Sequence, residues 1–128
     1  MKLSDLCVHV SLLRQKQKVG KHWGDYKLRV NKFLRSVIKK LYREGVLDQL
    51  LFHKNTCTFR ASNILSLKKL DRTYFNKNNR QKVVNQHLQN DSYCEILVST
   101  SQGIHTLREC FLSNIGGVLL AKYVKENA

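Results

Sequence analysis

With 128 residues, the chain can form one small domain or two small lobes with a modest core, and it is too short for a large enzyme. Lys and Arg number 23 against 9 Asp and Glu, and the resulting net charge of +14 favours a polyanionic partner. No run approaches the roughly 20 apolar residues that a membrane-spanning helix needs, so we expect no membrane span.

The chain begins with the pattern of an amphipathic helix rather than of a signal sequence. Asp5 and His9 interrupt the apolar run, and no small-residue cleavage site follows. Apolar side chains recur at the spacing of one buried helix face, at Leu3, Leu6, Cys7, Val10 and Leu13. Residues 14–24 are polar and basic with two glycines, which predicts a connecting loop.

A second and stronger helical pattern runs from Asp25 to Glu44, and Gly45 predicts its end. Its polar face carries only positive charge, at Lys27, Arg29, Lys32, Arg35, Lys39, Lys40 and Arg43. A charged helix face is most often simply solvated, but a solvated face normally mixes both signs. The single sign therefore favours contact with phosphate, and Lys32, Arg35 and Lys39 are candidates for that contact.

After Gly45 the apolar period changes from helical to extended. Val46–Phe52, Thr56–Phe59 and Ile64–Leu67 read as strands, with a turn at residues 54–55. We therefore expect residues 1–70 to form a basic N-terminal α/β lobe with two helices and a small antiparallel sheet. Residues 71–93 are polar and rich in Asn and Gln, which indicates a connection between lobes.

This connection contains two features of its own. The sequence predicts a short helix at residues 80–88. Arg72 and Tyr74 place an aromatic ring beside a cation, which suits either the stacking of a nucleic-acid base or a ring lying over a lobe interface.

The last part of the chain, residues 94–128, predicts a β-rich lobe with one short helix. A strand at Glu95–Val98 leads into a turn at residues 102–103 and a return strand. Thr106 and Glu109 have the spacing of a capping box for a helix that ends near Asn114. A strand over residues 118–124 closes the sheet. The whole chain is thus expected to be α+β, with two small lobes.

Charge and hydroxyl groups divide between these lobes. Residues 1–70 hold 16 basic and 4 acidic side chains, whereas residues 71–128 hold 7 and 5. Long-range charge supplies affinity without sequence information, so we expect specificity to lie in the nearly neutral second half. Ser99, Thr100 and Ser101 follow its first strand, and Gly103 permits a positive φ. These hydroxyls suit either contact with RNA sugars and base edges or the capping of a hairpin.

The residues give no support for a metal site or for catalysis. The four cysteines lie far apart without any CxxC, so zinc binding is disfavoured and buried free thiols are expected. The nine acidic residues are dispersed, and no histidine has a partner at catalytic spacing. We expect no enzyme activity, no cofactor and no small-molecule substrate.

Several of these motifs, in this order, resemble the family of small ribosomal subunit protein eight of the bacterial type. The C-terminal match comprises an apolar strand, Ser99-Thr100-Ser101 with Gly103, the helix capped by Thr106, the pair Gly116-Gly117, and an ending at Tyr123-Val124. The N-terminal match comprises Asp5, Tyr26-Lys27-Leu28 and Glu44-Gly45. The resemblance covers residues 3–54 and 94–124.

The resemblance implies a two-lobed constituent of the small ribosomal subunit that binds an internal stem in the central domain of the small-subunit rRNA, early in assembly. Neighbouring small-subunit ribosomal proteins would be its other partners, and a free regulatory RNA-binding protein is the alternative. The implied RNA contacts are the loop Ser99, Thr100 and Ser101, the backbone contact Lys27, and the pair Gly116 and Gly117.

Two departures from the family pattern are present. Val118 stands where the family has Glu, and the Arg72-Thr73-Tyr74 element lacks the Pro-Gly that precedes its family counterpart. The chain also begins near the family's own start, and Lys, Asn, Leu and Ile are plentiful while proline is absent, as an AT-rich gene would give. We therefore expect a mitochondrial ribosomal protein, with a plastid or the bacterial cytoplasm as alternatives.

Overall fold

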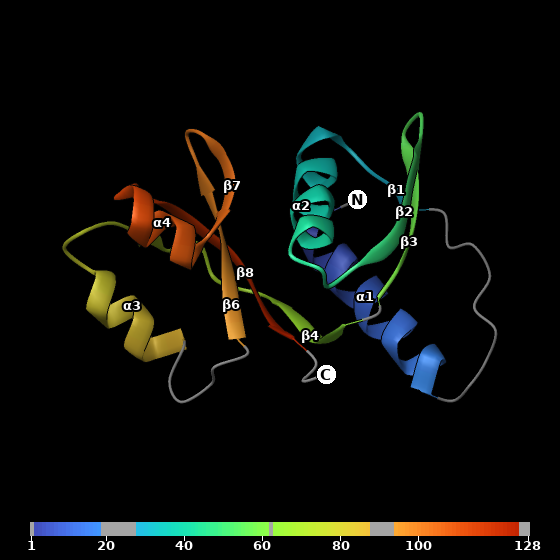
Figure 1. Cartoon of the computed structure of the whole chain (residues 1–128), viewed down its shortest axis with the longest axis horizontal. Helices are drawn as coiled ribbons and strands as arrows, with labels where there is room; N and C mark the ends of the chain where they lie inside the picture. The colour runs from blue at the N-terminus through green and yellow to red at the C-terminus, as the bar shows by residue number, and fades with distance from the viewer. Residues whose placement is uncertain (1, 19–27, 62, 88–93, 126–128) are drawn as a thin grey trace.

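The computed structural model describes residues 2–18, 28–61, 63–87 and 94–125, and it has the predicted α+β fold. The N-terminal part combines helices with a small antiparallel sheet, and the C-terminal part combines strands with a short helix (Figure 1). The elements follow in the order α1 (Leu3–Lys18), β1 (Leu28–Arg29), α2 (Lys32–Arg43), β2 (Asp48–His53), β3 (Thr56–Arg60), β4 (Ile64–Lys69), β5 (Tyr74–Phe75), α3 (Arg80–His87), β6 (Cys94–Thr100), β7 (Gly103–Thr106), α4 (Leu107–Ser113) and β8 (Gly117–Lys125).

Helix α1 buries the predicted Leu3, Leu6, Cys7 and Val10, and because it continues to Lys18 the prediction of a loop at residues 14–18 was wrong. Helix α2 is shorter than expected. The side chain of Asn31 accepts a hydrogen bond of 2.9 Å from the backbone N–H of Leu34, so Asn31 is the N-cap of α2. The prediction of helix immediately before this cap was wrong, because Leu28 and Arg29 pair with β3 as strand β1. Gly45, with φ of 80°, ends α2 as predicted.

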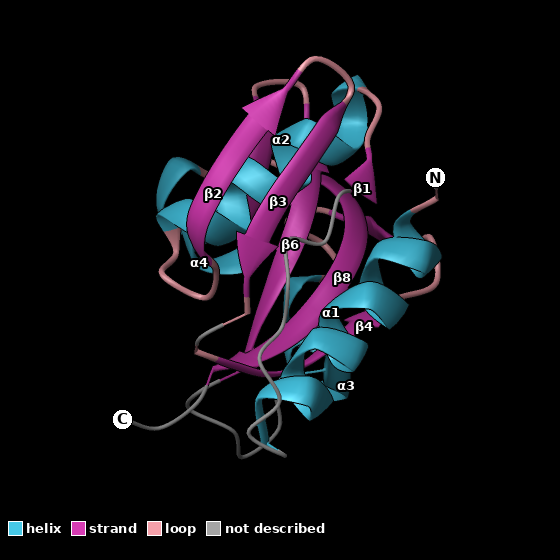
Figure 2. Ribbon diagram, turned by 90° about the vertical axis from the view of Figure 1, so that its right-hand side faces the viewer, coloured by secondary structure: helices cyan, strands magenta, loops and turns pink. Residues whose placement is uncertain are grey.

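A three-stranded sheet in the order β1-β3-β2 lies across α2 (Figure 2). Strands β2 and β3 form an antiparallel hairpin whose turn lies at Lys54 and Asn55, as the sequence predicts. This sheet and the helices α1 and α2 are called the N-terminal lobe below.

The second sheet has five strands and includes segments that were expected elsewhere. Its order is β4-β8-β6-β7, and β5 also pairs with β8. Ile64–Leu67 was assigned to the small N-terminal sheet, but β4 pairs with β8 instead. Residues 71–93 were expected to connect the lobes and to contain one short helix. That helix, α3, begins at the predicted Arg80, and the segment also contributes the strand β5. This sheet, with α3 and α4, is called the C-terminal lobe below.

Apolar side chains pack on both faces of the five-stranded sheet. On one face Leu97, Ala121 and Tyr123 join the core of the N-terminal lobe, together with residues of α1 and α2. On the other face Ile96 and Val98 pack with side chains of α3 and α4. The two lobes therefore share one core cluster, and their relative position is set by packing across this sheet. No helix within the described ranges is long and apolar enough to cross a membrane.

Candidate nucleic-acid interface

The hydroxyl loop lies at the turn between β6 and β7, and one of its three hydroxyl groups stabilises that turn. The Thr100 hydroxyl donates a hydrogen bond of 2.8 Å to the carbonyl oxygen of Gly103 and accepts one of 3.1 Å from the backbone N–H of Gln102. Gly103 has φ of 112°, a backbone conformation that favours glycine. Thr100 and Gly103 thus have a structural role in the hairpin.

The other two hydroxyl groups of this loop are available for binding. Ser101 is exposed and Ser99 is half-buried, and neither side chain has a hydrogen-bond partner among the described residues. A serine hydroxyl can both donate and accept, and little side-chain entropy is lost when it is fixed. Ser99 and Ser101 can therefore bind sugar hydroxyls, phosphate oxygens or base edges.

Strand pairing extends this loop into a row across the sheet. Ser99 lies opposite Ile104 on one side and Val118 on the other, and Val118 lies opposite Tyr74. Directly opposed residues of antiparallel strands project on the same face, so these four residues form one row, called the cross-strand row below. Tyr74 is 60% exposed and can offer its ring to a nucleic-acid base.

The register that aligns this row was missed by the sequence reasoning. Arg72 and Tyr74 were recognised as a cation beside an aromatic ring, but nothing local to that segment indicates that β5 pairs with β8. Since β8 lies between β5 and β6, Tyr74 and Ser99 share a face although they are 25 positions apart in the sequence. Val118, which replaces the Glu of the resembling family, lies between them and makes the middle of the row apolar.

The glycine pair serves close packing of strands. A Cβ on Gly117 would collide with the carbonyl oxygen of Ser99 and with the side chain of Val98. A Cβ on Gly116 would collide with the carbonyl oxygen of Phe75. The resemblance gives Gly116 and Gly117 as RNA contacts, and the geometry supports a role in the close approach of neighbouring strands.

Two of the candidate cations of α2 contact the same aromatic ring of the β2–β3 hairpin. The Arg35 guanidinium donates a hydrogen bond of 2.9 Å to the carbonyl oxygen of Lys54 and lies 4.6 Å from the centre of the Phe52 ring. The ammonium of Lys39 lies 5.5 Å from the same ring. Lys32 and Lys39 are exposed, whereas Arg35 is half-buried and ties α2 to the β2–β3 hairpin. Lys27, the remaining candidate, lies outside the described residues.

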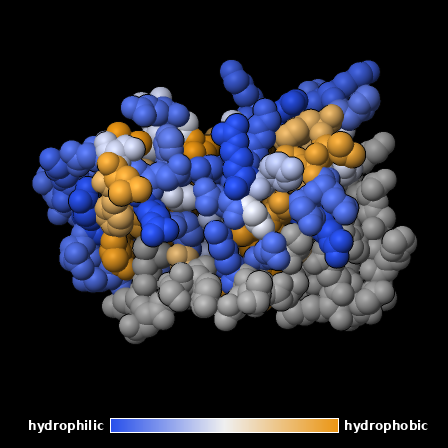
Figure 3. All heavy atoms as spheres, viewed as in Figure 1, coloured by the Kyte–Doolittle hydropathy of each residue, from blue (hydrophilic) through white to orange (hydrophobic). Residues whose placement is uncertain are grey.

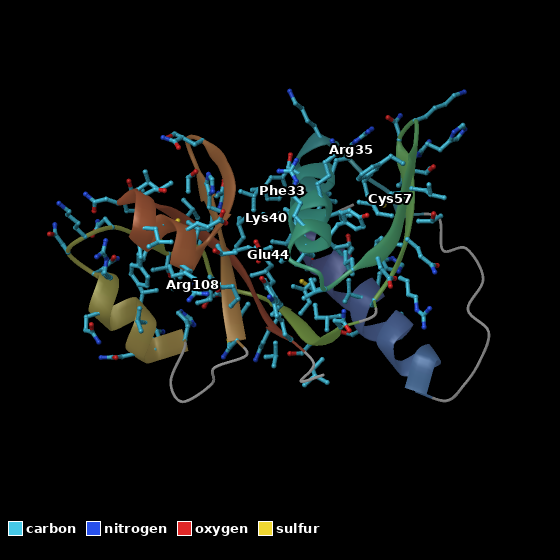
Figure 4. All side chains as sticks on the ribbon, in the orientation of Figure 1. Phe33, Arg35, Lys40, Glu44, Cys57 and Arg108 are labelled. Atoms are coloured by element: carbon cyan, nitrogen blue, oxygen red, sulfur yellow. The ribbon has the colours of Figure 1, made fainter. Side chains whose placement is uncertain are left out.

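An ion pair joins the two lobes next to this face. Figure 4 shows Lys40 and Glu44 on the side of α2 toward the C-terminal lobe. The Lys40 ammonium lies 2.5 Å from a carboxylate oxygen of Glu109 on α4 and 3.2 Å from one of Glu44. Glu109 also completes the predicted capping box with Thr106.

The protonation of this ion pair follows from its contacts. Burial raises the pKa of Glu109, but hydrogen bonds from Lys40 and from the backbone of Thr106 outweigh burial and hold the pKa at about 2. Burial lowers the pKa of Lys40, and its two carboxylate partners more than compensate, so the pKa lies above its ordinary value. Both groups are therefore charged at neutral pH.

The cysteines have the environment expected of inert thiols. All four are buried, and burial raises the pKa of Cys7, Cys57 and Cys110 to about 11. Within the part of the chain that the structure describes, no three His, Cys, Asp or Glu side chains lie close enough together to hold a metal ion.

No family model matches this sequence, and a search of curated proteins finds no relative. The resemblance to small ribosomal subunit protein eight therefore rests on the sequence motifs alone. Structural support for a function comes from the candidate interface.

Proposed function

We propose that this chain is a structural constituent of the small ribosomal subunit, which binds a stem in the central domain of the small-subunit rRNA and supports subunit assembly and translation. The observation that carries the proposal is the cross-strand row. It places an exposed aromatic ring, an apolar side chain and the available hydroxyl of Ser99 on one face of a sheet.

The chemistry of the row suits RNA with irregular structure. A regular A-form helix presents a shallow minor groove with sugar hydroxyls, which Ser99 and Ser101 can bind. Unpaired or distorted positions expose base faces, against which the Tyr74 ring can stack. The excess of positive charge supplies attraction to phosphate that is independent of sequence. Binding to rRNA needs groups that recognise the RNA and cations that supply affinity. The serine hydroxyls and the Tyr74 ring provide the first, and the basic side chains provide the second.

The setting of this binding follows from the resemblance. In this proposal neighbouring small-subunit ribosomal proteins are the other partners, and the ribosome is that of a mitochondrion, with a plastid or a bacterial cytoplasm as the alternative setting. The chain acts without catalysis and without a cofactor.

A test on ribosomes distinguishes this function from that of a free regulatory RNA-binding protein. A ribosomal constituent should co-sediment with the small subunit and remain bound in high salt, because many contacts hold it in place. A regulatory protein should be released from the particles under the same conditions. Release at moderate salt from otherwise intact subunits would contradict the ribosomal assignment.

A binding assay tests the interface directly. Ser99→Ala and Ser101→Ala together should weaken binding to the cognate rRNA stem by about 2 kcal/mol, or roughly 30-fold, at about 1 kcal/mol for each lost hydrogen bond. The matched control is Ser113→Ala, which alters an exposed serine on α4 away from the row. Equal affinity of the double variant and the control would refute the contact assignment.

A further inference from the structure

A groove of about 360 Å³ lies between the two lobes, beside the hydroxyl loop. One wall comes from α2, with Ser36, Lys39, Lys40 and Arg43, and the facing wall comes from the β6–β7 hairpin and the start of α4, with Gln102 and Gly103. Figure 1 shows α2 and β7 facing each other in the middle of the molecule, and Figure 3 shows hydrophilic side chains over this region of the face.

The groove has an excess of positive charge that its own ion pairs leave unneutralised. The groove lining contains three cations and one carboxylate, that of Glu109. Lys40 is engaged by Glu109 and by Glu44, and its single positive charge does not neutralise both carboxylates. Arg43 is exposed and has no ion-pair partner among the described residues. The Lys39 ammonium lies over the Phe52 ring and has no ion-pair partner within the described ranges. Two cations therefore remain to bind an anion.

Besides His105 and Glu109, the facing wall offers uncharged polar groups. Gly103 is exposed and has no side chain, so its exposed surface is backbone, and the position where a Cβ would stand is open space. Gln102 is exposed beside it and carries both a donor and an acceptor. Ile104 lines the groove and also belongs to the cross-strand row, so the groove and the row form one continuous surface.

From this arrangement we infer that the groove binds the sugar–phosphate backbone of a single RNA strand, with Arg43 and Lys39 on its phosphates and the hairpin wall against its sugars. The inference rests on the proposed function and specifies where one strand of the RNA passes. A groove of this volume holds a unit the size of a small ligand, which a nucleotide is and a duplex is not. The same strand would continue from the groove onto Ser99 and Tyr74.

Two kinds of variant test this inference. Lys39→Gln with Arg43→Gln should lower the affinity for the rRNA stem at moderate salt and reduce the slope of log K against log salt by about 1.4, or roughly 0.7 for each phosphate contact of a single strand. The matched control, Lys82→Gln, removes an exposed cation of α3 and should leave both quantities unchanged.

A second variant blocks the groove without changing its charge. Ser36→Phe places a bulky side chain on the α2 wall and should lower affinity at least tenfold. Ser113→Phe, the same change at an exposed serine on α4, should not. Circular dichroism and thermal unfolding would establish that each variant is folded. Ser36→Phe leaves the charge of the protein unchanged, so it should not weaken RNA binding that depends only on general electrostatic attraction. A loss of RNA affinity in this variant therefore indicates that RNA binds in the groove.

The outcomes separate this inference from the proposed function. If the unaltered chain binds rRNA and the groove variants bind like their controls, the groove assignment is overturned and the proposed function stands. The assignment is equally overturned if the groove variants keep their RNA affinity and instead lose binding to an acidic peptide such as oligoglutamate. If the unaltered chain binds no rRNA, the proposed function fails and the groove assignment fails with it.

Discussion

The ion pair between Lys40 and Glu109 should measurably stabilise the contact between the lobes. Lys40→Met removes the ammonium while keeping most of the stem, and Glu109→Gln removes the partner charge. The pair joins α2 to α4 at 2.5 Å, and Glu44 is a second partner of Lys40 at 3.2 Å. A double-mutant cycle on these two positions isolates their interaction from the other contacts of each residue.

The burial of the two side chains sets the magnitude. The side chain of Lys40 is 12% exposed and that of Glu109 is 39% exposed, so this ion pair is intermediate between a buried ion pair and a surface ion pair. Exposed pairs contribute about 0.2–1 kcal/mol, and removing one partner of a buried pair costs about 3–5 kcal/mol. Because solvent screens Glu109, we expect a coupling free energy of about 1 kcal/mol at neutral pH, near the top of the exposed range.

Urea unfolding followed by circular dichroism measures this coupling, and its pH dependence provides a second check. The pKa of Glu109 is about 2 in the folded protein and 4.5 in a reference peptide. A carboxyl group whose pKa is depressed by folding stabilises the protein fully above its unfolded pKa, and this contribution is lost as the pH falls through the folded value. The coupling should therefore decline from pH 4.5 toward pH 2. A coupling near zero at pH 7, or one that does not change with pH, would refute the reasoning.

Two further predictions concern the five-stranded sheet. The Tyr123 hydroxyl is buried without a hydrogen-bond partner among the described residues. Tyr123→Phe should therefore raise the free energy of unfolding by about 1 kcal/mol in urea titrations. A loss of stability would show that the hydroxyl has a hydrogen-bond partner. Gly117→Ala should lower the free energy of unfolding by about 2 kcal/mol, because the added methyl group would force β8 away from Ser99. A neutral result by the same assay would contradict this account of the glycine pair.

Local signals in the sequence predicted the local structure well. The capping box at Thr106 and Glu109 is present with both of its hydrogen bonds, and Gly45 ends α2. A tight turn closes the β6–β7 hairpin one residue earlier than predicted, at residues 101–102, and Gly103 already pairs with Thr100. Each of these features depends on residues within four positions of one another, so a short stretch of sequence is enough to predict it. The start of α2 was misplaced because its apolar period extends back through Val30, whereas the cap at Asn31 decides where the helix begins.

Features that depend on long-range pairing were not predictable in the same way. The placement of β4 and β5 beside β8 brings together segments about 50 positions apart, and no composition or spacing indicates which partner each strand chooses. The cross-strand row and the groove follow from this pairing. The sequence therefore indicated the hydroxyl loop and the basic helix separately, and the fold supplied the surface that connects them.

The central place of β8 has a consequence for how the protein acquires its structure during synthesis. Among the described elements β8 is the last to leave the ribosome, yet it lies between β4 and β6, and its Tyr123 belongs to the core of the N-terminal lobe. Until residues 117–125 emerge, β4 lacks its pairing strand and that core lacks part of its lining. Long-range closure of this kind slows folding and leaves a strand edge open to aggregation. A nascent chain of this protein thus depends on β8 to cover the open edge of β4.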